Sequence, residues 1–216
     1  MMKNQRGFTL IELAIVLVII GLLLGGVLKG QELINSAKVK NMASDFRNVQ
    51  VQIYSYQDKF RALPGDDKAA QTHVGATATN GDGDGVIEGA CCNGTGGIST
   101  GESLQVWQQL RLANLATGTT TVADATYQPT NAEGGMIGVQ SNPQLAITGL
   151  TGSYAVCSSG ILGKFAKELD TALDDGVTTT GSMMVASAVT GAAGAAPVAT
   201  TASNFDSTKY VVCMAF

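Results

Sequence analysis

The feature that most constrains this sequence is an apolar run from Phe8 to Leu28, which begins directly after Arg6 and Gly7. Glu12 is the one charged residue inside the run. At about 1.5 Å per residue, a helix of this length reaches roughly 30 Å, which is enough to cross the hydrocarbon core of a membrane. A secretory signal peptide has a shorter apolar stretch followed by a small-residue cleavage site. The run is therefore better interpreted as a membrane anchor.

The charges around the run predict its orientation and narrow the choice of partners. Lys3 and Arg6 precede it, so the positive-inside rule keeps the first residues cytoplasmic and sends the rest of the chain outward. The formal net charge is -4, and loss of these two cations makes it more negative. Nucleic acid is therefore an unlikely partner. Charged residues make up only 14% of the chain, which is more typical of exported proteins than of cytosolic enzymes.

A second pattern extends the helix beyond the apolar run. Apolar residues recur at steps of three and four, which places them on one face of a helix, with polar residues between them. These residues are Val39, Met42, Phe46, Val49, Ile53, Tyr56 and Phe60. The first proline is Pro64, which is followed by Gly65. The sequence therefore predicts one helix from residue 8 to about residue 60, apolar all round at first and amphipathic afterwards.

The remainder of the chain, residues 64–216, predicts a globular head. Helical spacing is present over residues 103–115 and 163–176. Short apolar runs typical of strands follow, at residues 134–140, 144–150, 153–158, 182–189 and 209–216. This order favours an α+β fold, in which an antiparallel sheet packs against the long helix.

The N-terminal residues also resemble a known family. Residues 3–7 followed by "FTLIELAIVLVIIGLLLGG" are similar to the class III signal of type IV prepilins and pseudopilins. The resemblance covers about 60 residues, and beyond the helix only the segment "ALPGDD" and the general layout match. It implies that a prepilin peptidase cuts between Gly7 and Phe8 and methylates the amino group of Phe8. Many members carry a proline near the 22nd processed residue, where this chain has Lys29.

The resemblance also implies a domain organisation and a function. The expected parts are a leader (residues 1–7), a transmembrane and filament-core helix (8–28), its amphipathic continuation (29–63) and a pilin-like head (64–216). The expected role is a structural subunit of a type IV pilus-like filament, made of copies of this or related chains. The alternatives are a minor pilin or a pseudopilin of a type II secretion or DNA-uptake system.

The partners and the location follow from the same resemblance. They are the prepilin peptidase, other pilin subunits, the inner-membrane assembly machinery and the membrane itself. The head is expected in the periplasm before assembly, and the filament at the cell surface or in the periplasm afterwards. A membrane-anchored enzyme is a distant alternative, because the single histidine, His73, has no nucleophile at a recognisable spacing and no phosphate-binding motif is present.

Glu12 is the fifth residue of the processed chain, and its position has a physical interpretation. A carboxylate in the low-dielectric core of a filament needs a cation within a few ångströms. Cleavage creates such a cation, the amino group of Phe8. We therefore expect Glu12 to neutralise the N-terminus of a neighbouring subunit or its own, and so to select the register of assembly. The alternative is an acidic residue near the membrane edge without a special role.

Four cysteines on the exported side of the membrane favour disulfides over thiols. Cys157 and Cys213 lie in two strand-like runs, and we expect them to pair. Cys91 and Cys92 are adjacent, so they either pair with each other despite strain or leave one thiol unpaired. Buried reduced cysteines are the alternative. A zinc site is disfavoured, because the chain has one histidine and lacks paired CxxC motifs.

The stretch "NGDGDGVIEGAC" has the spacing of a calcium loop. Oxygen ligands alternate along it, and the expected set is the side chains of Asn80, Asp82, Asp84 and Glu88 with the carbonyl of Val86. The twelfth position is a cysteine instead of a glutamate, so this is not an EF-hand. The alternative is that Asn-Gly and Asp-Gly only form tight turns. A second acidic group, Asp170, Asp174 and Asp175, is better interpreted as helix-surface charge and a turn. No other cofactor is expected.

Overall fold

The computed structural model describes residues 9–92, 101–189 and 194–216 of the chain. The chain forms two compact units, and the division between them falls between Lys38 and Val39. It lies inside helix α1 (Leu10–Phe60), which is continuous across it.

The first unit contains the N-terminal part of α1. The continuous helix confirms the prediction made from the apolar run and the stripe that follows it, for the residues that the structure describes. Every large apolar side chain between Leu10 and Ile34 is exposed. Among the described helices, α1 is the one whose length and composition would allow it to cross a membrane.

The C-terminal part of α1 belongs to the second unit and is buried along one face. From Val39 to Tyr56 the predicted stripe is buried, and Phe60 packs at the edge of the same core. The helix ends where Arg61 adopts a left-handed backbone conformation (φ 57°), three residues before Pro64. The spacing of three and four therefore predicted correctly which face of the helix is covered.

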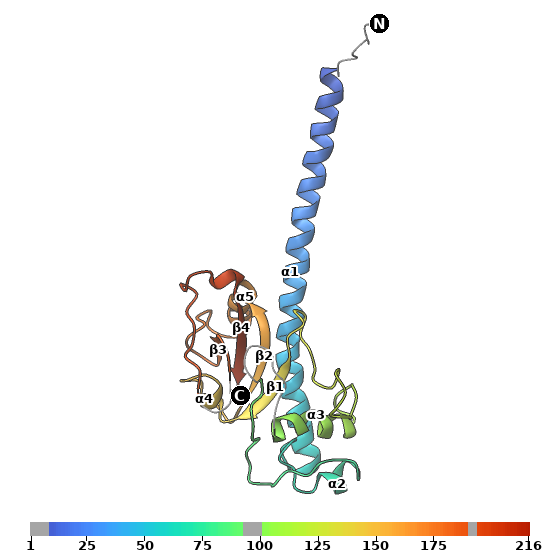
Figure 1. Cartoon of the computed structure of the whole chain (residues 1–216), viewed down its shortest axis with the longest axis vertical. Coiled ribbons are helices and arrows are strands. Elements are labelled where there is room, and N and C mark those ends of the chain that lie inside the picture. The colour runs from blue at the N-terminus through green and yellow to red at the C-terminus, as the bar shows by residue number, and fades with distance from the viewer. Residues whose placement is uncertain (1–8, 93–100, 190–193) are drawn as a thin grey trace. The chain divides into compact units, whose positions relative to one another are not determined.

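Four antiparallel strands form a single sheet in the second unit. They are β1 (Ile137–Ser141), β2 (Tyr154–Leu162), β3 (Met183–Ala186) and β4 (Lys209–Ala215), in the spatial order β1-β2-β4-β3 (Figure 1). The long helix and this sheet confirm the predicted α+β class.

The two faces of the sheet pack into two separate cores, because successive strand residues point to opposite faces. On β2, Val156 joins a core that includes the buried stripe of α1, whereas its neighbours Ala155 and Cys157 join a second core. On β4, Val212 faces the first core and Val211 the second. The sheet is thus buried on both faces, and the second core surrounds the cysteines.

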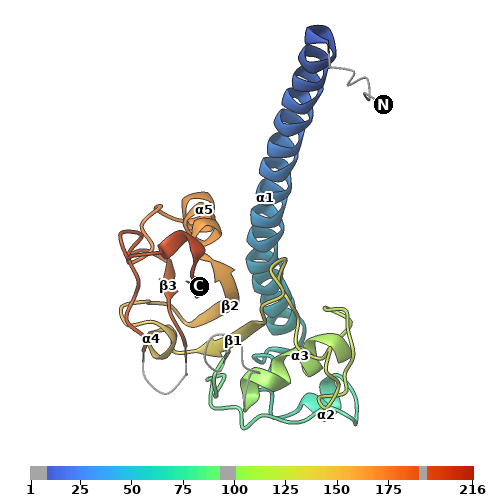
Figure 2. The same cartoon turned by 45° about the horizontal axis from the view of Figure 1, so that its top comes forward.

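The second unit also contains short helices. They are α2 (Ala70–His73), α3 (Glu102–Leu112), α4 (Pro143–Ala146), α5 (Gly163–Leu173) and the 3-10 helix η1 (Phe205–Ser207). Both views show α2 and α3 beside the C-terminal part of α1 (Figures 1 and 2). Trp107 of α3 is buried in the same core as the α1 stripe.

One strand prediction is wrong. Residues 144–150 do not form a strand, because Pro143 occupies the first turn of α4. Proline has its φ angle fixed at a helical value and lacks an N–H, so it starts a helix more readily than it continues a ladder. Ile147 then makes only an isolated bridge with Ala195, and Gly149 turns the chain with a φ of 93°.

Candidate functional site

The first turn of α1 holds Glu12 in a reciprocal pair with Thr9, the residue before the helix. The backbone N–H and the hydroxyl of Thr9 donate to Oε2 of Glu12, at 2.8 and 2.7 Å, and the Glu12 N–H donates to the Thr9 hydroxyl at 3.3 Å. This is a capping box, which satisfies donors that the start of a helix otherwise leaves unpaired. Within one chain, therefore, Glu12 already has hydrogen-bond partners.

A second candidate site lies in the second unit, where the loop after α2 wraps around a buried carboxylate. Asp66 accepts hydrogen bonds from the N–H groups of Gly83 (2.6 Å) and Asp84 (3.1 Å) on one oxygen, and from Gly85 (2.8 Å) on the other. Gly83 and Gly85 both have positive φ angles. A side chain at Gly81 would collide with the backbone of Asp66. The alternating glycines of the loop thus let its backbone close around Asp66.

A second buried carboxylate holds the same loop from another direction. Glu102, the first residue of α3, accepts the N–H of Asp82 on Oε1 (3.1 Å) and the N–H of Glu88 on Oε2 (3.2 Å). Its side chain is buried, as is that of Asp66. The loop is therefore fixed by two acidic residues that lie outside it in the sequence.

The structure brings only part of the expected calcium ligands together. Carboxylate oxygens of Asp82, Asp84 and Asp66 all lie within 4.8 Å of one another. The Asn80 side chain instead accepts the N–H of Gln71, at 2.9 Å. Glu88 is not part of this group of three side chains. The group consists of side-chain carboxylates, so the carbonyl of Val86 stays a predicted ligand. The expected and observed sets thus share Asp82 and Asp84.

The electrostatics of the acidic cluster favour a cation. Burial raises the pKa of Asp66, the N–H groups of the loop lower it, and the charge of Asp84 raises it further. Burial likewise raises the pKa of Glu102, with added contributions from the charges of Asp66 and Asp82. Carboxylates crowded in this way are destabilised by one another, and hard cations such as Ca²⁺ bind oxygen ligands of this kind.

His73 is occupied by a structural contact. Its Nδ1 lies 2.7 Å from Oδ2 of Asp67, which also accepts the hydroxyl of Tyr56 at 2.7 Å. The imidazole stacks on Phe60, with 5.2 Å between ring centroids. The one histidine of the chain thus ties the turn after α1 to the end of that helix.

The cysteines gather in the second core. Cys157 and Cys213 form a disulfide, which confirms the predicted pairing. They face each other directly in the register of β2 and β4, so the bond joins two neighbouring strands. Cys91 and Cys92 are both buried and lie outside this disulfide.

Comparison with known proteins identifies the N-terminal segment. Residues 2–28 match the family model described as the prokaryotic N-terminal methylation motif. The chain carries the class III signal of type IV pilins and pseudopilins. The long helix and the antiparallel sheet form the α+β architecture expected from the sequence. Neither the curated proteins nor the solved structures include a match to the chain.

Within the class III signal, the matched segment contains the expected processing residues. Gly7 and Phe8 lie outside the residues that the structure describes, and Glu12 lies in the first turn of α1. Lys29, which stands where many pilins have a proline, forms an ion pair with Glu32 at 2.7 Å on the exposed helix surface. Helix α1 continues through that position.

Three residues of the two sites were not predicted from the sequence: Thr9, Asp66 and Glu102. Thr9 could have been found, because Thr-x-x-Glu before an apolar run is the sequence signature of a capping box. Asp66 and Glu102 could not, because nothing in their local sequence shows that they contact the loop between them.

Proposed function

We propose that this chain is a structural subunit of a type IV pilus-like filament. In this proposal a prepilin peptidase cuts after Gly7 and methylates Phe8, and the inner-membrane assembly machinery then polymerises the chain through α1. The observation that carries the proposal is the combination of the methylation motif with an apolar helix surface that is exposed in the described residues.

The uncovered surface supports polymerisation for a physical reason. In the membrane, lipid covers the apolar side chains between Leu10 and Ile34. In a filament, the helices of neighbouring subunits replace the lipid with comparable apolar contact, so that extraction does not require the whole transfer free energy. The head then forms the exterior of the filament, first in the periplasm and finally at the cell surface.

Glu12 gives the packing its register in this proposal. Its carboxylate is expected to pair with the amino group of Phe8 on a neighbouring subunit, a group that exists only after cleavage. In the single chain, Thr9 provides two hydrogen bonds but no positive charge. A buried carboxylate that is hydrogen-bonded but not neutralised is still costly. An alignment of subunits that places the Glu12 carboxylate beside the amino group of Phe8 is therefore favoured over other alignments.

Substitution of Glu12 tests the assembly role. The variant Glu12→Val, in a host with the complete assembly machinery, is expected to be cleaved like the unmodified chain but to lose filaments at least tenfold by electron microscopy. Glu32→Gln is the matched control, because it removes a carboxylate from the same helix at an exposed ion pair, and it should assemble normally. Wild-type filament levels in Glu12→Val would contradict the proposed role.

The closest alternative is a minor pilin or a pseudopilin, because the same signal occurs in both classes. We favour a pilus because the head, residues 64–216, is larger than a minimal pseudopilin needs. Immunogold labelling of intact cells distinguishes a pilus subunit from a pseudopilin. A pilus subunit is abundant outside the cell, whereas a pseudopilin stays within the envelope. A tethered enzyme would be revealed by catalytic activity in the head alone.

We also propose that the cluster of Asp66, Asp82 and Asp84 binds Ca²⁺. The specific observation in its favour is the convergence of three carboxylates beside the further buried carboxylate of Glu102. The competing interpretation, in which Asp82 and Asp84 only cap turns, is supported by their bonds to the N–H groups two residues on, at 3.1 and 2.8 Å. The two interpretations predict different effects of Ca²⁺ on the melting temperature of the chain.

Thermal melts with Ca²⁺ and with a chelator separate these interpretations. A bound ion stabilises the folded state, so millimolar Ca²⁺ should raise the melting temperature of the wild-type chain by several degrees. Asp84→Asn should abolish this rise. Asp124→Asn is the matched control, because Asp124 is exposed and caps a turn in the same way, at 2.8 Å to the N–H of Thr126, and it should keep the rise. An unchanged wild-type melt would support the turn interpretation.

A further inference from the structure

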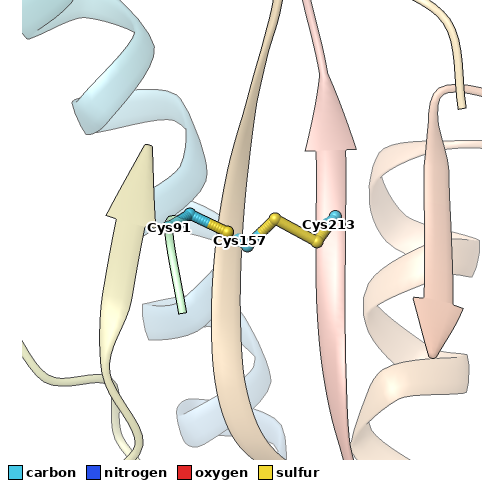
Figure 3. A group of neighbouring side chains, drawn as sticks. All are labelled: Cys91, Cys157 and Cys213. Carbon is cyan, nitrogen blue, oxygen red and sulfur yellow. A yellow bond between two sulfur atoms is a disulfide. The ribbon is translucent and has the colours of Figure 1, made fainter. Parts of the chain in front are cut away.

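Three sulfur atoms lie close together in the second core. The Sγ atoms of Cys91, Cys157 and Cys213 all lie within 4.8 Å of one another, and all three residues are fully buried. Figure 3 shows Cys91 beside β2, with its sulfur directed toward Cys157, while the disulfide joins Cys157 to Cys213 on β4. A third cysteine at this distance from a disulfide is an alternative partner for it.

Buried hydrogen bonds hold Cys91 in this position. Its N–H donates to the side-chain carbonyl of Gln140 on β1, at 3.0 Å, and its own carbonyl accepts from Gln128 at 3.3 Å. Four residues earlier, the N–H of Ile87 donates to the hydroxyl of Ser141 at 2.8 Å. These bonds fix the end of the loop that carries Asp82 and Asp84, here called the acidic loop, on β1. Cys91 is held in place with it.

Cys92 occupies a different environment. Its thiol lies against backbone carbonyl oxygens, those of Cys157 at 3.7 Å and Met136 at 3.9 Å. Cys92 is not part of the group of three sulfurs. The two adjacent cysteines are therefore not equivalent: Cys91 faces the disulfide, and Cys92 faces the backbone of the strands.

We propose that Cys91 and the Cys157–Cys213 disulfide form an exchange set, so that the head has a second disulfide isomer in which Cys91 is bonded to Cys157. The Cys91 thiolate attacks Sγ of Cys157, the bond between Cys157 and Cys213 breaks, and Cys213 leaves as a thiolate. The proton released by Cys91 goes to solvent, and Cys213 takes one up. One disulfide and one thiol are present before and after, so no oxidant or reductant is needed.

The exchange changes what the disulfide holds together. In the observed isomer it joins β2 to β4, two strands that are already paired. In the second isomer it ties the end of the acidic loop to β2, and β4 is held by hydrogen bonds and packing alone. A disulfide thus anchors the end of the loop that carries Asp82 and Asp84 to the sheet in one isomer and not in the other.

The surroundings of Cys91 keep the exchange slow in the folded head. Burial raises the pKa of the Cys91 thiol, and the neighbouring thiol of Cys92 raises it further. Only the thiolate attacks a disulfide, so at neutral pH the reactive form is rare. The exchange rate should therefore rise about tenfold for each pH unit below that pKa.

The first test asks whether Cys91 can replace Cys213. The full-length variant Cys213→Ser, in detergent, is treated with oxidised glutathione and mapped by peptide mass spectrometry. It should close a bond between Cys91 and Cys157, and so should Cys213→Ser with Cys92→Ser. The matched variant Cys213→Ser with Cys91→Ser should instead remain a glutathione adduct. Closure through Cys92 at the same rate, or no closure in the variant that keeps Cys91, would overturn the proposal.

The second test follows the exchange in a chain that keeps its native disulfide, so it does not depend on how Cys213→Ser folds. The full-length Cys92→Ser variant is incubated at pH 7, 8 and 9, quenched in acid denaturant and labelled with a maleimide. Label should move from Cys91 to Cys213, with an initial rate about tenfold higher for each pH unit. Label on Cys91 alone at every pH, or a rate independent of pH, would overturn the proposal.

Discussion

The two units of this chain differ in whether their large apolar side chains are exposed or buried. In the first unit, the large side chains between Leu10 and Ile34 are exposed, whereas in the second unit the α1 stripe from Val39 to Tyr56 is buried. The second unit even buries a carboxylate, Asp170, both of whose oxygens lack a hydrogen-bond partner of normal geometry. The same helix thus passes from a region that needs an external apolar partner to a region that supplies its own.

This difference shows that continuity of secondary structure does not imply a shared source of stability. Helix α1 is continuous across the division at Lys38. Burial of apolar surface is the dominant favourable contribution to folding. The second unit obtains it from its own residues, whereas the large apolar side chains between Leu10 and Ile34 in the first unit stay exposed.

Removal of the first unit should have the largest effect. A chain that begins at Lys38 keeps the whole buried stripe and loses the exposed apolar surface, so we expect a soluble monomer with a folded head. Size-exclusion chromatography without detergent and far-UV circular dichroism check this. Aggregation of the truncated chain would show that the second unit also needs an external apolar partner. It would contradict the view that this unit buries its own apolar surface.

Two alanine substitutions on α1 sharpen the contrast. Phe46 is 1% exposed in the first core, so Phe46→Ala should lower the free energy of unfolding of the head by about 3 to 5 kcal/mol. Ile19 is 50% exposed, and Ile19→Ala should change it by less than about 0.5 kcal/mol. Denaturant unfolding of both full-length variants in detergent measures the difference. Equal effects would contradict the assignment of stability to the head alone.

Burial of Asp170 makes the stability of the second unit depend on pH. Burial raises its pKa to about 6, with smaller increases from the charges of Asp175 and Asp174. A carboxyl whose pKa is raised in the folded state favours folding while it is protonated. Its stabilising effect is complete below about pH 4 and is lost as the pH rises through 6.

The expected result is a difference between two variants. From pH 4 to 7 the wild-type head should lose about 2 to 3 kcal/mol of stability relative to Asp170→Asn, which has no carboxyl to ionise. Glu168→Gln is the control on the same helix, because Glu168 is exposed, and its stability should follow the wild-type curve. Parallel curves for wild type and Asp170→Asn would mean that Asp170 is not destabilised by burial.

The smallest effect compares the buried and exposed faces of α1 within the second unit. Burial raises the pKa of Asp67, but hydrogen bonds from His73 and Tyr56 outweigh it and leave that pKa lowered. Tyr56→Phe removes one of these bonds and should cost about 1 to 2 kcal/mol, with a rise in the pKa of Asp67. Tyr54→Phe, on the exposed face, should cost less than about 0.5 kcal/mol. Unfolding curves and NMR titration of Asp67 distinguish the two.

The parts of the fold that were predictable are those that depend on local sequence. The spacing of apolar residues in α1 is a property of neighbouring turns, so both its length and its buried face could be predicted. Cys157 and Cys213 were paired correctly because each lies in a clear strand-like run. Residues 144–150 have an apolar pattern typical of a strand, but Pro143 fixes the start of a helix there.

The candidate sites were less predictable, because their members come from distant parts of the chain. Asp82 and Asp84 could be selected from their spacing, but Asp66 and Glu102 reach them only through the fold. The proximity of Cys91 to the disulfide has the same origin, since hydrogen bonds to Gln140 and Gln128 place it there. No local pattern reports contacts of this kind.

The central claim is that the N-terminal segment is a processed assembly element. The most direct test is the intact mass and the N-terminal sequence of the full-length chain, expressed together with a prepilin peptidase. We predict a chain that begins at Phe8 and carries one added methyl group. A chain that still begins at Met1 or Met2, in the presence of an active peptidase, would contradict the account and make the apolar run an ordinary membrane anchor.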